Sequence, residues 1–213
     1  MIRVNIGCGR TPTSGWQNYD NSLALKLAKY PLITFFLKSL NLLGETQIEN
    51  IEWNRKNRIK FADATKKLPF NDGSVDVIYT SHMLEHLSRI GAKNFLIEAK
   101  RSLCNGGILR VSVPDLKIYI NRYIENSDAD AFMSSTLVSY GELTTLKQKL
   151  KLLVVGFRHH QWMYDANSLS KLLLDAGFNQ VFVLEAGNTK IKNYEGLNLS
   201  ERSSQSLYVE AVK

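Results

Sequence analysis

The first twenty residues constrain the fold of this chain more than any other segment. An apolar strand pattern, Arg3–Ile6, runs directly into Gly7-Cys8-Gly9, and a second short run ends on Asp20. Glycine has no Cβ, so a Gly-x-Gly turn can adopt a positive φ and bring bare backbone close to a ligand. A carboxylate after the next strand can accept hydrogen bonds from ribose hydroxyls. This suits an adenosine-type cofactor at the carboxyl ends of a parallel sheet.

The glycine motif departs from the dinucleotide-binding pattern. Arg10, Thr11 and Pro12 follow Gly9 where a third glycine would stand. The spacing from Gly9 to Asp20 is about half of the roughly twenty residues of the nicotinamide pattern. A dinucleotide is therefore disfavoured, and a plain tight turn at the glycines and a helix N-cap at Asp20 remain as alternatives.

Composition and cysteine usage indicate one ordinary globular domain. The chain has 213 residues, 44% of them hydrophobic, which is enough to bury a full core. Cys8 and Cys104 make no disulfide framework, so we expect a reducing, cytoplasmic compartment. The N-terminus is typical of a strand and not of a signal peptide. Lysines and a proline interrupt Leu23–Leu43, so no bilayer-spanning segment is expected.

The net charge of +7 is dispersed along the chain. A solvated surface explains most of it, and attraction to an anionic substrate or membrane surface is the alternative. The basic runs lack the interleaved aromatic residues that bind nucleic-acid strands, so we expect no nucleic-acid partner. The sequence predicts no oligomeric state.

Short strand patterns alternate with helical patterns, which indicates an α/β fold with a parallel sheet. Helices are expected from about Arg89 to Leu103 behind Ser88, and over Asn167–Ala176 behind Asp165 or Asn167. Two amphipathic segments, residues 22–50 and 115–160, are expected to be helical insertions that form a lid or acceptor pocket on one domain, residues 1–213. The expected strands are Arg3–Ile6, Gln17–Tyr19, Ile59–Ala62, Val75–Tyr79, Gly107–Val113, Gln180–Glu185 and Leu207–Val212.

Taken together, several motifs resemble class I S-adenosylmethionine-dependent methyltransferases. The most specific is Leu68-Pro69-Phe70 followed by Asp72–Tyr79 and Ser81–Leu87, which contains the letters LEHL. Ala62-Asp63-Ala64 and Gly106–Asp115 resemble the family as well, as does the glycine turn. The resemblance is closest to small bacterial methyltransferase type 11-like proteins, some of them linked to surface-polysaccharide genes.

The resemblance implies a Rossmann-like, doubly wound sheet of seven mostly parallel strands, the last one antiparallel. It implies S-adenosylmethionine as cofactor, with the Gly7-Cys8-Gly9 turn lining its methionine end. The sequence departs from the family pattern in three places, one of which is Cys104-Asn105, where Lys-Pro is common before Gly-Gly. Thr11–Trp16 is too short for a first helix of several turns, and Asn5 stands where an acid is usual.

The same resemblance implies roles for residues after the second, third and fourth strands. Asp20 would hold the ribose hydroxyls. Asp63 would accept a hydrogen bond from the adenine amino group, beside the backbone amide of Ala64, and the alternative for Asp63 is a turn. Ser81 and His82 would lie beside the sulfonium.

Methyl transfer is an in-line displacement, in which the protein mainly aligns and desolvates the reactants. An oxygen or nitrogen acceptor must also lose a proton, and histidine suits that role near neutral pH. His82 is the first candidate for this base, and ordering of the loop is its alternative role. His160 and Tyr164, within Arg158–Asp165, are candidates for the acceptor-side wall, where the alternative is an N-capping segment. We expect a small-molecule or saccharide acceptor, favoured as anionic by the basic charge.

Other classes of function remain open. His82-x-x-Glu85-His86 fits the inverted zinc-peptidase signature. A catalytic zinc needs a third protein ligand, and no downstream acid stands out, so we expect no metal. Leu23–Leu43 and Leu146–Phe157 combine leucine and phenylalanine with lysine, as helices at a bilayer interface do. A membrane-peripheral protein, or a non-catalytic domain of this fold, is therefore an alternative.

Overall fold

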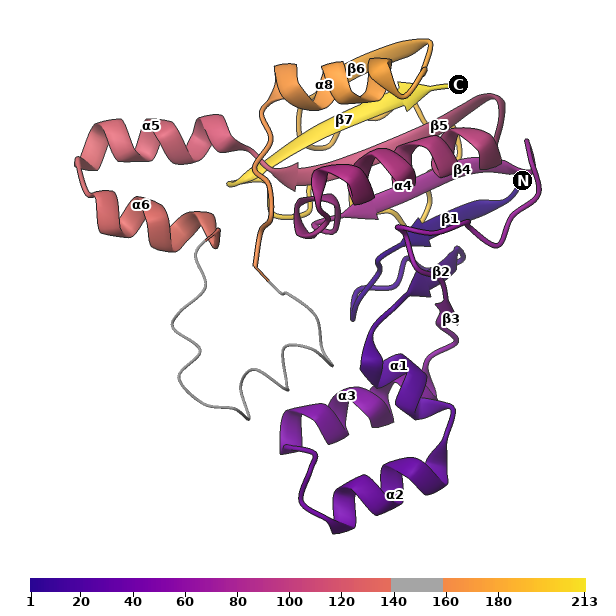
Figure 1. Cartoon of the computed structure of the whole chain (residues 1–213). Coiled ribbons are helices and arrows are strands. Elements are labelled where there is room, and N and C mark those ends of the chain that lie inside the picture. The colour runs from indigo at the N-terminus through magenta and orange to yellow at the C-terminus, as the bar shows by residue number, and fades with distance from the viewer. Residues whose placement is uncertain (139–158) are drawn as a thin grey trace.

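The computed structural model describes residues 1–138 and 159–213. Its central element is a seven-stranded sheet (Figure 1). The strands pair in the order β3-β2-β1-β4-β5-β7-β6. Neighbours are parallel except at β7, which is antiparallel to both β5 and β6. This confirms the Rossmann-like sheet. The strands are β1 (Arg3–Ile6), β2 (Gln17–Asp20), β3 (Lys60–Phe61), β4 (Val75–Ser81), β5 (Leu103–Pro114), β6 (Gln180–Leu184) and β7 (Ser206–Val212).

The largest difference from the expected strands lies at the start of β5. The sequence predicts that a turn at Asn105-Gly106-Gly107 precedes this strand, which in fact begins at Leu103. Val75 pairs with Leu103 and Val77 with Ile108, so the register shifts between them. Gly106 has a φ of 76°. The glycines therefore form an irregularity within the strand, where they favour a bend rather than a chain reversal.

Local capping sets the starts of the two helices that pack on the sheet. Ser88 caps α4 (Arg89–Ser102), where its hydroxyl accepts from Gly91 N at 3.1 Å. Asp165 caps α8 (Ala166–Asp175), where its carboxylate accepts from Ser168 N at 2.7 Å. Both caps confirm the sequence prediction. The other helices are α1 (Leu23–Ala28), α2 (Pro31–Ser39), α3 (Glu45–Lys56), the short 3-10 helix η1 (Leu84–His86), α5 (Leu116–Asn126) and α6 (Ala129–Thr136).

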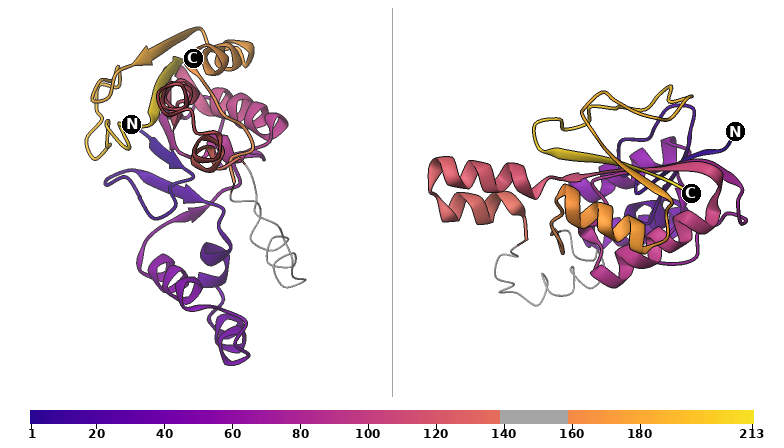
Figure 2. Two further views of the ribbon diagram at one scale, coloured as in Figure 1. Left: turned by 90° about the vertical axis from the view of Figure 1, so that its left-hand side faces the viewer. Right: turned by 90° about the horizontal axis from the view of Figure 1, so that it is seen from above.

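Helices α4 and α8 cover one face of the sheet, and an irregular segment, residues 185–205, covers the other (Figure 2). On the helical face, apolar side chains of β4, β5 and β7 pack with Phe95 and Leu169 in the main core. On the other face, Trp16 and Tyr79 pack against Ile191. The connection between β1 and β2 contains no helix, as we predicted from the short segment Thr11–Trp16. This connection is shorter than a parallel crossover usually is.

A buried ion pair anchors residues 185–205 to the sheet. Arg110 on β5 and Glu210 on β7 are both fully buried, and Arg110 Nη1 lies 2.7 Å from Glu210 Oε1. The guanidinium also donates to the carbonyl oxygens of Asn188 and Leu199. The carboxylate accepts from the Thr189 hydroxyl and the backbone N–H of residue 190. The pair therefore supplies hydrogen-bond partners for backbone groups of residues 185–205, which in a helix would have bonded to one another.

The two insertions lie at the carboxyl ends of the strands. Helices α1, α2 and α3 follow β2 and form a group of their own beside it (Figure 1). Helices α5 and α6 follow β5. Leu146–Phe157, considered above as an interfacial helix, lies outside the described residues. Among the helices that are described, none is long and apolar enough to span a membrane.

Candidate functional site

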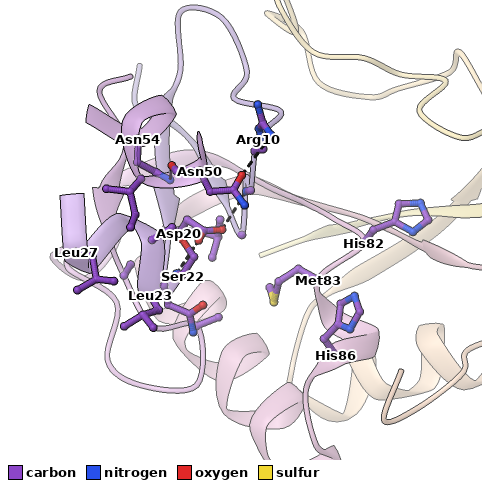
Figure 3. A pocket seen from close by; sticks show the side chains of 18 of the residues that line it. Arg10, Asp20, Ser22, Leu23, Leu27, Asn50, Asn54, His82, Met83 and His86 are labelled. Carbon is purple, nitrogen blue, oxygen red and sulfur yellow. Dashed lines mark hydrogen bonds between the residues drawn. The ribbon is translucent and has the colours of Figure 1, made fainter. Parts of the chain in front are cut away.

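A pocket of about 650 Å³ opens at the carboxyl ends of β1, β2 and β4, facing α1 and α3 (Figure 3). One wall is the glycine turn and the end of β2. The opposite wall is the segment after β4, and α1 and α3 contribute a third side. The lining residues are Ile6, Gly7, Gly9, Arg10, Asp20–Ala24, Leu27, Leu43, Gln47, Asn50, Ile51, Asn54, Ala62, Ala64, His82, Met83, His86 and Leu87.

The glycine turn brings backbone without side chains to this pocket. Gly7 and Gly9 have φ values of 74° and 50°, which are costly for residues with a Cβ. A Cβ at Gly7 would lie 2.9 Å from Met83 Cβ, so close packing of the turn against the segment after β4 requires glycine. A Cβ at Gly9 would meet nothing within 4 Å and would project into open space. The bare backbone at Gly9 can therefore approach a ligand.

Asp20 lies beside this turn and lines the pocket. Its Oδ2 accepts from Gly9 N at 3.0 Å, and its Oδ1 accepts from Ser22 N at 2.7 Å. Each oxygen keeps a lone pair for a further donor. The N-cap of α1 is Ser22, whose hydroxyl accepts from Leu25 N, so the N-cap alternative for Asp20 is wrong. The carboxylate therefore lines the pocket with lone pairs that remain for a donor.

Three other predicted cofactor residues do not line the pocket with their side chains. Cys8 packs with Leu25 and Ile59, and burial raises the pKa of its thiol to about 12. Asp63 lies in a turn, where its Oδ1 accepts from the backbone N–H and the hydroxyl of Thr65. Asp63 therefore has the role of a turn residue, which the sequence analysis gave as its alternative. Ala64, in contrast, lines the pocket. The Ser81 hydroxyl is buried without a hydrogen-bond partner among the described residues.

His82 is the one predicted catalytic residue that lines the pocket. It follows β4 with a φ of 48°, a conformation that is strained for a residue other than glycine and occurs often at functional sites. Its Nε2 lies 2.9 Å from the Ser206 hydroxyl, and its Nδ1 lies 3.4 Å from Glu85 Oε1. The hydrogen bond at Nε2 orients the imidazole, and Nδ1 lies near the carboxylate without a hydrogen bond among the described residues.

His160 and Tyr164 lie outside the pocket lining. Tyr164 is fully buried in the main core, and burial raises the pKa of its phenol. His160 is also buried, which lowers the pKa of its imidazole, and its ring contacts that of His86 with centroids 5.0 Å apart. The structure thus brings His160 to the segment after β4 rather than to the pocket itself.

Sequence reasoning missed the polar residues that α3 contributes. Asn50 and Asn54 stand four residues apart and line the pocket from the same helix face. Asn50 Oδ1 accepts from Arg10 Nη1 at 3.2 Å, and the Arg10 guanidinium lies over the Trp53 ring. The i, i+4 spacing of amide side chains inside an expected lid was the available signal.

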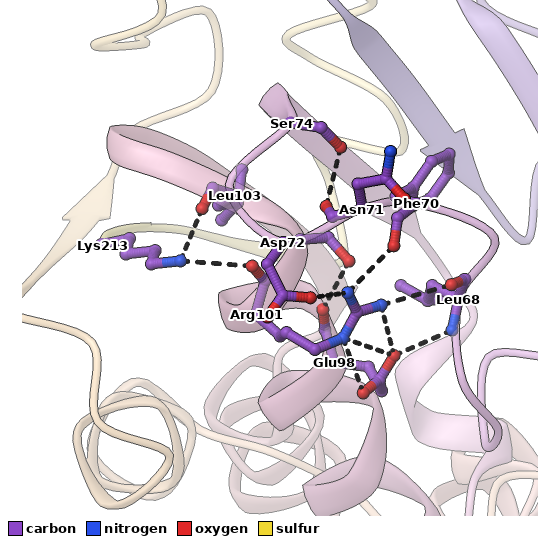
Figure 4. A network of polar contacts seen from close by, with 10 residues as sticks. Leu68, Phe70, Asn71, Asp72, Ser74, Glu98, Arg101, Leu103 and Lys213 are labelled. Atoms are coloured by element: carbon purple, nitrogen blue, oxygen red, sulfur yellow. Dashed lines mark hydrogen bonds and ion pairs between the residues drawn. The ribbon is translucent and has the colours of Figure 1, made fainter.

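The first part of the most specific sequence motif, residues 68–72, lies at the amino end of β4 (Figure 4), whereas its last part, Ser81–Leu87, contributes His82 and His86 to the pocket. Arg101 on α4 donates to the carboxylates of Glu98 and Asp72 and to the carbonyl oxygens of Leu68 and Phe70. Its hydrogen bond holds the pKa of Glu98 below the usual value. This first part of the motif therefore fixes the loop that enters the central strand.

Comparisons with known proteins agree on one fold. Residues 37–111 match the family model described as a methyltransferase domain. A structure of a SAM-dependent methyltransferase from Thermotoga maritima aligns with a TM-score of 0.51 and 16% identity, over 100% of this chain and 82% of that one. A SAM-dependent methyltransferase from Mesorhizobium loti aligns with a TM-score of 0.51 and 16% identity, over 100% of this chain and 90% of that one. A SAM-dependent methyltransferase from Methanosarcina mazei aligns with a TM-score of 0.51 and 17% identity, over 99% of this chain and 91% of that one. No curated protein matches the sequence significantly.

Proposed function

We propose that this chain, a class I S-adenosylmethionine-dependent methyltransferase by its fold and by the family model that it matches, methylates a small anionic or saccharide acceptor. One observation carries the proposal: Gly9, Asp20 and His82 meet in a single pocket at the carboxyl ends of the parallel strands. Its volume of about 650 Å³ lies in the range of small-molecule sites.

The residues of the pocket fit the cofactor. When bound, S-adenosylmethionine supplies an electrophilic methyl group on a good leaving group. The backbone at Gly9 lies closest to where a ligand can approach, and Asp20 keeps lone pairs for ribose hydroxyls. Alignment of the reactants by such contacts can contribute about 7–11 kcal/mol to lowering the barrier.

His82 is the proposed proton acceptor, since it lines the pocket at the end of β4. The Ser206 hydroxyl, 2.9 Å from Nε2, orients the ring, and Glu85 Oε1 lies 3.4 Å from Nδ1. We place the acceptor between His82 and α3, where Arg10 would attract an anion and Asn50 would accept or donate hydrogen bonds.

Calorimetry with S-adenosylmethionine and S-adenosylhomocysteine tests the cofactor, and transfer of a labelled methyl group to anionic metabolites and saccharides tests the reaction. We expect binding of both nucleosides and a labelled product. If neither nucleoside bound, the proposal would fail. Binding without transfer to any acceptor would identify the non-catalytic alternative.

Asp20→Asn is expected to weaken S-adenosylhomocysteine binding at least about tenfold, because hydrogen bonds to a charged group contribute about 1.5–3 kcal/mol. Asp63→Asn is the matched comparison. It is expected to have the smaller effect, because Thr65 already occupies its Oδ1. Calorimetry measures both affinities, and thermal unfolding verifies that both variants are folded. Wild-type affinity in Asp20→Asn would contradict the ribose role.

A second proposal concerns the location of the protein in the cell, where we infer a cytoplasmic protein that contacts an anionic membrane surface. Helix α2 presents Leu32, Phe35 and Phe36 with 76%, 65% and 62% of their surfaces exposed. Between Asp20 and Glu45 the sequence has three lysines and no acidic residue, a pattern that favours anionic lipid. Leu27 and Leu43 of the same insertion line the pocket, so such a contact would bring the pocket to the membrane surface.

Flotation with liposomes tests this contact. We expect the protein to float with anionic vesicles and to stay behind with neutral ones, and the double variant Phe35→Ser/Phe36→Ser to lose most of the bound fraction. Ile90→Ser is the control, since Ile90 is 76% exposed but lies on α4. Absence of flotation by the wild-type protein would exclude the proposal.

A further inference from the structure

Glu85 is a buried carboxylate at the centre of three histidines. Its side chain is fully buried on η1, and the described residues give neither of its oxygens a hydrogen bond. Glu85 Oε1 lies 3.4 Å from His82 Nδ1, 3.9 Å from His160 Nε2 and 4.0 Å from His86 Nε2. A buried charge without partners is costly, so a cation is expected among these groups.

Two of the histidines are oriented with one nitrogen toward Glu85. His86 Nδ1 lies 3.1 Å from the carbonyl oxygen of His159, and His160 Nδ1 lies 2.7 Å from that of Thr136. A carbonyl oxygen can only accept, so each Nδ1 carries the hydrogen. In the neutral imidazole, Nε2 then presents its lone pair toward the carboxylate. A backbone carbonyl that fixes the second ring nitrogen is the usual arrangement around metal-bound histidine.

Backbone contacts hold these residues together independently of any ligand. The N–H groups of Gln161 and Trp162 donate to the carbonyl oxygen of Glu85 at 2.8 and 3.2 Å. The Gln161 side chain donates to the carbonyl oxygen of His86 at 2.7 Å. The stretch that contains His160 is therefore fastened to η1, although the two are far apart in the sequence.

We propose that Glu85, His86 and His160 bind one divalent transition-metal ion, with zinc as the best match. The ligand atoms of these three residues lie within 4.8 Å of one another. In a tetrahedral zinc site, ligand atoms about 2.0–2.2 Å from the ion lie about 3.3–3.6 Å apart, so side-chain shifts of about 1 Å complete the set. Two imidazoles and one carboxylate are a donor set that binds zinc and related ions.

His160 is the third protein ligand that the His82-x-x-Glu85-His86 signature alone did not supply. In this arrangement Glu85 is itself a ligand, so the peptidase alternative, which needs it as a base, is not supported. His86 lines the pocket, and an ion beside it can coordinate an oxygen of the acceptor. Only this last step rests on the proposed methyl transfer, and the binding of the ion does not.

Metal titration of untagged, chelator-treated protein tests the site. Zinc is titrated by calorimetry and cobalt by its visible absorption, which reports ligand geometry. We expect one ion per chain, and at least about tenfold weaker binding in Glu85→Gln and His160→Ala. Cys104→Ser is the control for adventitious thiol binding and should bind as the wild type does, since Cys104 lies at the other end of the sheet.

Absence of saturable zinc and cobalt binding by the wild-type protein would overturn the proposal, whatever the variants do. Wild-type affinity in a folded His160→Ala variant would also overturn it, as would loss of binding in Cys104→Ser. Binding of S-adenosylhomocysteine to the metal-free protein is measured in parallel. It is expected to persist, so failure of the metal site and failure of the cofactor site are distinguished.

Discussion

Replacing Glu210 with alanine is expected to lower the free energy of unfolding by about 3–5 kcal/mol, because it leaves the buried charge of Arg110 without its partner. Both side chains are fully buried, and their closest atoms are 2.7 Å apart. The change also removes the acceptor for the Thr189 hydroxyl and for one backbone N–H of residues 185–205. That segment covers a sheet face without helices, so we expect it to loosen. Urea unfolding of the two proteins measures the effect.

The exposed pair Lys171–Asp175 on α8 is the matched control. Its atoms are 3.3 Å apart, and both side chains are more than half exposed. Asp175→Ala is expected to change the free energy of unfolding by less than about 0.5 kcal/mol. The double variant Arg110→Met/Glu210→Leu removes both charges, but it should remain less stable than the wild type, since the carbonyl oxygens of residues 188 and 199 lose their donor. A loss below about 1 kcal/mol in Glu210→Ala would show that the segment does not depend on the pair.

Gly9→Ala is expected to weaken S-adenosylhomocysteine binding about 10–100-fold. The new methyl group meets no protein atom within 4 Å and projects into the pocket, where it would occupy space that the ligand needs. Forcing an extra methyl group into a close contact costs about 1–3 kcal/mol, which corresponds to about 10–100-fold in affinity. The positive φ of residue 9 also disfavours alanine, which lowers the stability of the free and the bound protein alike.

Gly15→Ala separates these two effects. Gly15 belongs to the same connection between β1 and β2, has a φ of 74° and likewise has open space around a Cβ, but it does not line the pocket. Both variants should lose about 1–2 kcal/mol of stability from the strained backbone, which thermal unfolding measures. Only Gly9→Ala should lose affinity in calorimetry. Equal affinity in the two variants would remove the glycine turn from the binding site.

The sheet was readable from the sequence because its strands are short apolar runs bounded by polar turns. The antiparallel last strand followed from the resemblance, whereas the strand order was not predicted, since periodicity alone does not say which strands are neighbours. The helix caps at Ser88 and Asp165 were readable because they depend on contacts three residues away. The cover of the second face was not readable, because residues 185–205 have no periodic pattern and depend on Arg110 and Glu210, which meet only in the folded sheet.

The candidate site was predictable only in part. Gly9, Asp20 and His82 stand at strand ends, where topology alone brings them together. Asp63 and Tyr164 follow strands or precede a helix in the same way, yet the turn and the core take up their side chains. Side-chain direction at a strand end depends on the next few backbone angles, and a motif does not specify these angles. The approach of His160 to Glu85 was invisible because it joins distant segments through backbone contacts.

The missing helix after β1 has an electrostatic consequence for ligand binding. In dinucleotide-type folds, the first helix directs its N-terminal macrodipole at an anionic group, and this attraction is fixed in place and partly shielded from solvent. Here Arg10 carries the full positive charge among the described residues that line the pocket, and its side chain is solvent-exposed. Attraction of an anionic ligand group to this exposed charge is screened by dissolved ions over about 10 Å at 0.1 M. Cofactor affinity is accordingly expected to fall as ionic strength rises.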